Sequence, residues 1–419
     1  MKHALFGQDV RRHRLPNGLT VVTARRSNSE VVAVLILYRA GLLHEPPDLC
    51  GVAHLTEHML FRGTESRPQG WIDATTGALG GLNNALTTSD YTAYYFVLPA
   101  GHWRVPLEIE ADRMMNCLFD ASSFETERRV AIEERSMLSD DPDAVLDESS
   151  AALAFAVHPY GRPVAGRRED LERMSLDDVR RFYDSYYVPG RAVLVVAGGI
   201  EHDAVRGAAE LCFGDIAATG GTPPRVPQEP EQREERRRVV QLPGVSRQCM
   251  VSYRCPDAGH EDGPALEVLT ALLSSGRSSR LYRRFVGDSG VATEVSASRH
   301  LDEDPGLFQV SASVLPEIEE GDFERDLDEA LAGVVSSPPD SRELDKARAL
   351  ISADLALSRE SSLGLAGTLA FWESLGGWEK GTAFDRAVLD VRSDDLVRVV
   401  GRYLTSDRRN VVWLRPRAA

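Results

Sequence analysis

One stretch of this chain combines reactive side chains with helical spacing: Gly51-Val52-Ala53-His54-Leu55-Thr56-Glu57-His58. Side chains at positions i, i+3 and i+4 of a helix lie on one face, so His54, Glu57 and His58 share a side. Two imidazoles one turn apart can bind the same Zn²⁺, with the carboxylate beside the coordination position left for water. This arrangement suits metal-assisted hydrolysis.

The alternative is that these histidines are ordinary structural residues. The chain has 10 histidines, and a short motif of this kind also arises by chance. The neighbouring residues favour the metal site, because they describe a helix that is buried on one side. Gly51 precedes it, Gly63 follows it, and apolar residues interleave with the polar face. We therefore predict a short amphipathic helix here.

A catalytic zinc site usually has three protein ligands, so one ligand remains to be found. The segment Glu125–Arg135 is strongly helical in composition and contains Glu127 and Glu134, which are two turns apart on one side. One of them can bind the metal while the other supports a ligand. The alternative is a solvated helix face whose charges pair with each other.

Taken together, these segments resemble the pitrilysin-type zinc metallopeptidases, the inverzincins, to which mitochondrial processing peptidase and insulin-degrading enzyme belong. In this chain the glutamate at 134 follows the second histidine by 76 positions. The resemblance covers roughly residues 14 to 200 and includes further strings: Gly80-Gly81-Leu82-Asn83-Asn84-Ala85-Leu86-Thr87, Tyr91-Thr92-Ala93-Tyr94-Tyr95, His158-Pro159-Tyr160-Gly161-Arg162-Pro163, Phe182-Tyr183 and Tyr187-Val188-Pro189.

The resemblance implies a role for each residue of the motif. It makes His54, His58 and Glu134 the ligands of one Zn²⁺ per chain. It makes Glu57 the general base that takes a proton from water. It makes Glu127 the carboxylate that supports a ligand from behind.

The resemblance also implies that Asn84 and Ala85 hold the backbone of a peptide substrate. The peptide would add itself as an extra strand to an open sheet edge. From the residues alone, the alternative is a Gly-Asn turn before an ordinary strand.

An internal repeat indicates two homologous halves. The string Asp177-Asp178-Val179-Arg180 recurs as Asp394-Asp395-Leu396-Val397, an offset of 217, and the strand ending in Tyr38 resembles one ending in Tyr253, an offset of 215. We predict a zinc-binding domain at 1–217, an exposed linker at 218–238 and a homologous domain at 239–419.

Each half alternates strand-like segments with long helical ones, such as Glu324 to Val334 and Ser341 to Ser358. We predict an α+β fold in which each half is an antiparallel-rich sheet with helices packed on one face. The resemblance implies that the halves form a clamshell with a partner subunit.

The second half lacks the metal motif. At an offset of 215, the three motif positions become Leu269, Leu272 and Leu273, which predicts an apolar core helix. This half is therefore expected to serve as a structural or substrate-binding domain.

A second departure from the family follows Ser279-Arg280-Leu281. Family members have an arginine and, seven positions later, a tyrosine that are thought to assist the developing oxyanion. Here these positions hold Val286 and Thr293, and shifting the alignment to Arg283 or Arg284 places no tyrosine seven positions later. The resemblance then implies the zinc-bearing subunit of a heterodimer whose partner carries the arginine and tyrosine.

Composition sets the remaining limits. The 419 residues are 42% hydrophobic and 27% charged, which is typical of a globular protein of two or more domains. A formal net charge of −16 argues against a nucleic-acid partner. The N-terminus lacks the apolar segment of a signal peptide, and no apolar stretch is long enough to span a membrane. The five cysteines are scattered, which indicates a reducing compartment. We therefore expect a cytoplasmic protein.

The function predicted from the sequence is that of a zinc-dependent metalloendopeptidase that cleaves peptides or unfolded segments. The alternative is a zinc-bearing but inactive subunit that serves in assembly or in peptide binding.

Overall fold

The computed structural model describes residues 9–218 and 225–417 and separates into two compact units. Unit 1 comprises Met1–Arg135, Arg162–Val226 and Ala356–Thr382, and unit 2 comprises Ser136–Gly161, Pro227–Leu355 and Ala383–Ala419. The two units are defined by which residues pack together, whereas the predicted domains at 1–217 and 239–419 are defined by the internal sequence repeat. The two divisions answer different questions, so the domain boundaries remain a prediction. The N-terminal residues considered for a signal peptide lie outside the described part.

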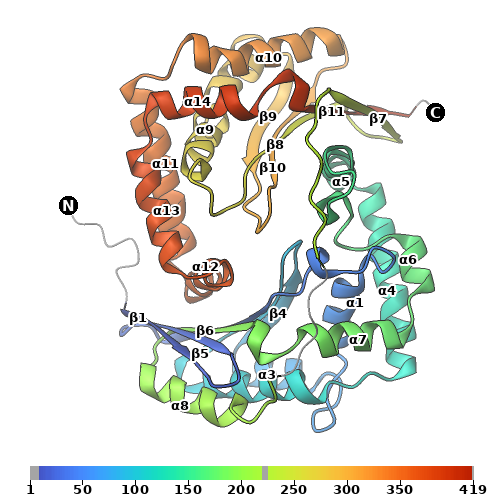
Figure 1. The fold of residues 1–419 in the computed structure, drawn as a ribbon, viewed down its shortest axis with the longest axis vertical. Coiled ribbons are helices and arrows are strands. Elements are labelled where there is room, and N and C mark those ends of the chain that lie inside the picture. The colour runs from blue at the N-terminus through green and yellow to red at the C-terminus, as the bar shows by residue number, and fades with distance from the viewer. Residues whose placement is uncertain (1–8, 219–224, 418–419) are drawn as a thin grey trace. The chain divides into compact units, whose positions relative to one another are not determined.

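Unit 1 is built on a six-stranded sheet of order β1-β2-β6-β3-β5-β4 (Figure 1). Its strands are β1 (Asp9–Arg14), β2 (Thr20–Arg25), β3 (Val31–Tyr38), β4 (Leu82–Thr87), β5 (Thr92–Pro99) and β6 (Ala192–Gly198). Neighbouring strands are antiparallel except for the parallel pair β2 and β6. Strand β4 lies at an edge, so the prediction of an edge strand in this segment is confirmed.

Helices cover both faces of this sheet. They are α1 (Val52–Met59), α2 (Trp71–Ala78), α3 (Arg104–Asn116), most of α4 (Ala121–Asp140), α6 (Arg168–Arg173), α7 (Leu176–Tyr186), α8 (His202–Phe213) and α12 (Ser362–Ser374). Strand β3 is nearly continuous in apolar residues, because alternate side chains enter cores on opposite faces. Val34 and Ile36 face the core that contains α1, whereas Ala33 and Leu35 face α12.

Unit 2 has a five-stranded sheet of order β7-β11-β8-β10-β9. Its strands are β7 (Arg236–Leu242), β8 (Gln248–Arg254), β9 (Ala292–Arg299), β10 (Leu307–Val314) and β11 (Arg409–Pro416). Its helices are α5 (Pro142–Ala154), α9 (Gly263–Ser274), α10 (Glu320–Ser336), most of α11 (Ser341–Ser358), most of α13 (Glu379–Asp390) and α14 (Ser393–Tyr403). The predicted linker at 218–238 therefore ends inside β7, and its residues 219–224 lie outside the described part.

The two sheets share one topology. Without β1, the strands of unit 1 follow the order first, fifth, second, fourth and third along the chain, and the strands of unit 2 do the same. Only the pair made by the first and fifth strands is parallel in each sheet. The α+β prediction of two similar halves with antiparallel-rich sheets is confirmed. Helix α9 is almost entirely buried and carries the three leucines, as predicted for a core helix.

Each unit also takes one helix from the other half of the sequence. Helix α12 follows β10 in the chain but packs on β3 and β6 of unit 1 (Figure 1). Helix α5 precedes β7 in the chain but packs on β8 and β11 of unit 2. Each borrowed helix covers the second face of its sheet, and the small residues Ala33, Ala93 and Ala197 line the face beneath α12. The prediction of helices on one face is thus extended by an exchanged helix on the other.

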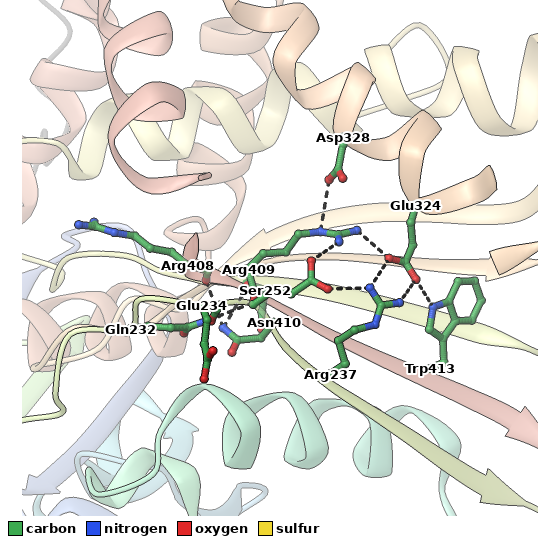
Figure 2. Close-up of polar contacts among 11 residues, drawn as sticks. Gln232, Glu234, Arg237, Ser252, Glu324, Asp328, Arg408, Arg409, Asn410 and Trp413 are labelled. Carbon is green, nitrogen blue, oxygen red and sulfur yellow. Dashed lines mark hydrogen bonds and ion pairs between the residues drawn. The ribbon is translucent and has the colours of Figure 1, made fainter. Parts of the chain in front are cut away.

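A group of ion pairs around the buried Glu324 and Arg409 fixes α10 to the sheet of unit 2 (Figure 2). The Glu324 carboxylate accepts hydrogen bonds from Trp413 Nε1 at 2.8 Å, from Arg409 Nη2 at 3.1 Å and from both terminal nitrogens of Arg237. Burial raises the pKa of Glu324, but these hydrogen bonds outweigh burial and hold it below its usual range. Figure 2 also shows Asp328 reaching Arg409 from α10. Removing one partner of such a group is strongly destabilising, because it leaves an uncompensated buried charge.

No helix within residues 9–218 and 225–417 is both long and apolar enough to cross a membrane.

The exchanged helix gives a test of the unit 1 core. Leu369→Ala on α12 should lower the free energy of unfolding by about 2–5 kcal/mol, because Leu369 is fully buried. Leu357→Ala is the matched control, since Leu357 is 65% exposed, and should change it by less than about 0.5 kcal/mol. Hydrogen exchange should accelerate at β3 and β6 in the first variant. Acceleration confined to β8 and β11 would contradict this assignment of α12.

Candidate metal centre

Helix α1 presents its three polar motif residues on one side and packs the other side against the sheet. Val52, Leu55 and Met59 are buried in the core, whereas His54, Glu57 and His58 are only partly buried. The helix begins after Gly51, whose φ of 97° suits glycine and where a Cβ would lie 2.6 Å from Gly166 Cα. The predicted amphipathic helix is confirmed.

Glu45 anchors the start of α1 and was not foreseen from the sequence. Its carboxylate is buried and accepts the backbone N–H groups of Gly51 and Ala53, each at 3.0 Å. These are free N–H groups at a helix N-terminus, where a negative charge is favourable. Burial nevertheless raises the pKa of Glu45 to about 7, against the effect of these hydrogen bonds and of the nearby Arg162. Arg162 in turn donates to the backbone oxygens of Leu42 and Glu45.

The side chains of His54, His58 and Glu134 converge on one point. His54 Nε2 and His58 Nε2 are 3.3 Å apart, and Glu134 Oε2 lies 3.6 Å from the first and 3.4 Å from the second. Bonds of about 2.0–2.1 Å at tetrahedral angles would separate the ligand atoms of zinc by roughly 3.4 Å. The distances between these three atoms, and their identity as two imidazole nitrogens and one carboxylate oxygen, therefore suit a zinc ion. Among the described residues, this is the cluster able to hold a metal ion.

Glu127 lies behind this cluster and orients one of its histidines. Glu127 Oε2 is 2.9 Å from His58 Nδ1, so the ring donates its Nδ1–H and keeps the Nε2 lone pair free for a metal. The other carboxylate oxygen forms an ion pair with Arg62. Glu127 is 6% exposed, and Arg62 is the cation that compensates its burial. Glu127 is one of the residues predicted from the sequence, whereas no sequence pattern pointed to Arg62.

The protonation of the site also suits metal binding. Burial, together with the neighbouring His58, lowers the pKa of His54 to about 4, so its ring is neutral at neutral pH. Burial raises the pKa of Glu57, while a hydrogen bond from Thr87 and the charge of His58 act in the opposite direction. A base with a raised pKa holds a transferred proton more readily than an exposed glutamate does.

A pocket of about 340 Å³ opens beside Glu57 and His58. Its remaining walls come from α2, from the residues that follow α1 and from Glu127: Phe61, Arg62, Gln69, Gly70, Asp73 and Glu127. The pocket thus combines one aromatic ring with charges of both signs. A substrate side chain has room here within reach of the metal cluster.

Strand β4 places Asn84 and Ala85 on opposite faces of the sheet edge. Ala85 pairs with Tyr94, lies on the face of the α1 core and packs against it. Asn84 pairs with Tyr95 on the other face and is exposed. Asn84 Oδ1 accepts the backbone N–H of Ala85 at 2.9 Å. The side chain of one predicted residue therefore caps the edge amide of the other.

The two departures from the family lie in unit 2. Val286 belongs to the π-helical turn η5 (Tyr282–Asp288) and packs against the apolar core of that unit. Thr293 is exposed on β9, where its hydroxyl donates to Ser313 O at 3.4 Å. Neither side chain supplies a cation or a phenol, so neither performs the role that arginine and tyrosine have in the family.

The chain is similar to known proteins along both of its halves. Residues 20–168 match the family model described as Insulinase (Peptidase family M16), and residues 173–351 match the model described as Peptidase M16 inactive domain. Zinc protease SCO5738 of Streptomyces coelicolor, itself uncharacterized, is 31% identical over 315 residues, which cover 73% of this chain and 68% of that protein. Zinc protease PqqE of Helicobacter pylori is 28% identical over 407 residues, which cover 96% of this chain and 92% of that protein.

The same likeness extends to solved structures. The crystal structure of a protease from Helicobacter pylori superposes with a TM-score of 0.92 at 27% identity and covers 98% of this chain and 100% of that one. The fold described above is therefore shared with a protease over its whole length.

The buried Glu45 predicts a pH dependence of stability. Its pKa is about 7 in the folded state against an ordinary value of 4.5 for glutamate, so the folded state binds a proton more tightly. The free energy of unfolding of the parent, relative to that of Glu45→Gln, should therefore fall as pH rises from about 4.5 to 7, by on the order of 3 kcal/mol. Denaturant unfolding of both metal-free proteins across this range measures the difference. A constant difference would contradict the raised pKa.

The metal cluster predicts a graded loss of zinc. His58→Ala removes one of three ligands and should leave the purified protein without bound zinc. Glu127→Gln should weaken zinc affinity by about 10- to 100-fold, because it frees the His58 ring from its negatively charged partner. Competition with a chelator measures both variants. The exposed Glu125 lies half a turn away, so Glu125→Gln is the control and should bind zinc as the parent does.

Proposed function

The chain belongs to peptidase family M16, and from that premise we propose that it is a zinc-dependent endopeptidase that cleaves peptides or unfolded segments. One observation carries the proposal: three donor atoms of His54, His58 and Glu134 lie 3.3–3.6 Å apart beside the partly buried carboxylate of Glu57. This is the donor set and spacing of a catalytic zinc site that keeps one position for water.

A zinc ion in this cluster supplies positive charge that polarises a peptide carbonyl and lowers the pKa of water. Glu57 takes the proton of the attacking water and passes it to the departing amine. Glu127 holds the His58 ring in place, and Arg62 forms an ion pair with the second carboxylate oxygen of Glu127. In this proposal Glu57 moves the proton, whereas Glu127 and Arg62 act indirectly through the position of His58.

Strand β4 is the proposed docking edge for the substrate backbone. The N–H of Ala85 points away from β5 and is occupied by the side chain of Asn84. A peptide strand that pairs with β4 replaces this internal hydrogen bond with one to its own carbonyl oxygen. Until then the side chain of Asn84 satisfies an edge amide that would otherwise pair with another chain. The preference for extended or unfolded substrates follows from this mode of pairing.

We further propose that this chain is the zinc-bearing subunit of a heterodimer in the branch that resembles mitochondrial processing peptidase. The basis is that Val286 is packed into an apolar core and Thr293 bonds within its own sheet. A related partner subunit would supply the arginine and tyrosine. The five cysteines are free, which supports the expectation of a reducing, cytoplasmic compartment.

Peptide cleavage tests these proposals directly. Zinc-loaded parent protein should hydrolyse unstructured peptides when mixed with the related partner and much more slowly alone. Glu57→Gln should lower kcat by at least about 10³-fold while zinc stays bound, because the ligands are intact and only the base is lost. Glu133→Gln is the matched control, since Glu133 is exposed on α4.

The outcomes separate the proposed function from its alternative. A chain that binds zinc and peptide but cleaves nothing with any related partner is an inactive assembly or peptide-binding subunit. Full activity of the isolated chain would contradict the heterodimer and leave the peptidase in place. An active Glu57→Gln variant would contradict the assignment of the base.

A further inference from the structure

A short chain of hydroxyl groups leads from Glu57 into the sheet. Thr87 Oγ1, at the end of β4, donates to Glu57 Oε2 at 2.5 Å. Thr87 Oγ1 is also 3.1 Å from Thr92 Oγ1 on β5. Thr92 Oγ1 in turn donates to the backbone oxygen of Ala40 at 2.7 Å. Three residues from separate segments thus connect the carboxylate to the backbone.

The chemistry of the groups determines where each proton lies. A backbone carbonyl only accepts, so the single Thr92 proton is held by Ala40. The two lone pairs of Thr92 then remain for its other neighbours, Thr87 and the phenol of Tyr187. An ionised Glu57 also only accepts, so the Thr87 proton points to Glu57. Thr92 is fully buried, which leaves no room for solvent to replace these contacts.

From this arrangement we propose that Thr87 is a positioning residue for Glu57 that serves both states of the base. It donates to the carboxylate before proton transfer. Once Glu57 holds a proton, the Thr87 hydroxyl turns its own hydrogen to Thr92 Oγ1 and accepts the proton of the Glu57 carboxyl group. The proposal rests on the proposed function, because it takes Glu57 as the general base.

The reversal needs only a rotation of one hydroxyl. No proton leaves Thr87 or Thr92. Because Thr92 donates to Ala40 in both states, the contact between the two hydroxyls becomes a hydrogen bond only when Thr87 turns its proton to Thr92. A valine at position 87 would remove the hydroxyl that donates to Oε2 of the partly buried Glu57. A serine would keep the hydroxyl and lose only a methyl group. The two substitutions therefore separate hydrogen bonding from packing.

The location of Thr87 also connects the base to the docking edge. Ala85 and Thr87 are two residues apart on β4, and both pair with residues of β5 on the face of α1. The strand whose backbone receives the peptide is the strand that aims the base. A shift of β4 would therefore move the Glu57 carboxylate together with the bound peptide.

The first test is a kinetic comparison of Thr87→Val and Thr87→Ser in the zinc-loaded protein with its partner. Thr87→Val should lower kcat at least tenfold while KM stays within twofold and bound zinc stays at the parent level. Thr87→Ser should retain kcat within threefold. Thr270→Val is the control, because the Thr270 hydroxyl makes a comparable bond within α9 of unit 2, and should match the parent.

The second test needs no turnover and uses the unfolding temperature of the metal-free protein. Thr87→Val should lower this temperature more in the parent than in Glu57→Gln, because only the parent then buries an unpaired carboxylate. Equal shifts in both backgrounds would overturn the contact between Thr87 and Glu57.

The kinetic outcomes also distinguish this proposal from the one on which it rests. A Thr87→Val variant as active as the parent would overturn the role of Thr87 alone. A Thr87→Ser variant as impaired as Thr87→Val would do the same, because the hydroxyl would then be irrelevant. A parent without turnover would overturn the general-base function itself and this proposal with it.

Discussion

The constraint on which unit 1 depends is that its central strands are apolar on both faces. Val34 and Ile36 of β3 need cover on one side, and Ala33 and Leu35 need it on the other. The first face receives α1, and the second receives α12 from the far half of the chain. Val52, Leu55 and Met59 of α1 are buried in this core, and their packing fixes the position of the helix on the sheet. The packing therefore also fixes the positions of His54, Glu57 and His58 on its opposite side.

The polar side of α1 is costly to bury, and the structure offsets that cost group by group. Glu127 is compensated by Arg62 and by the His58 ring. Glu45 is compensated by two N–H groups at the start of the helix, although its raised pKa shows that burial outweighs them. Among the described residues, Thr87 is the hydrogen-bond donor to Glu57, whereas Glu45 has two donors. The burial of Glu57 is therefore offset less completely than that of Glu45, which suits the role of base that we propose for Glu57.

Much of this could be predicted from the sequence. The spacing of His54, Glu57 and His58 on a helix, the helical Glu125–Arg135 segment and the duplicated strands are local or periodic patterns. The structure confirms the helices, the edge strand and the two sheets. The sequence did not predict Glu45, Arg62 or Thr87, because each acts through partners 6 to 65 positions away that only the fold brings close. The sequence also did not predict the exchange of α5 and α12. Hydrophobic periodicity shows which face of a helix is apolar, but not against which of the two sheets that face packs.

The two halves show what the scaffold requires and what the chemistry adds. In α9 the positions of the metal motif are Leu269, Leu272 and Leu273, and the helix is buried along most of its length. In α11 the positions equivalent to Glu127 and Glu134, at an offset of 217, hold the buried Leu344 and Ile351.

Both sheets nevertheless keep one strand order. The topology is thus independent of the metal, and apolar side chains serve the same positions at lower cost in desolvation. Carboxylates and imidazoles persist in α1 and α4 against that cost. The fold therefore does not account for these residues, whereas the proposed reaction does.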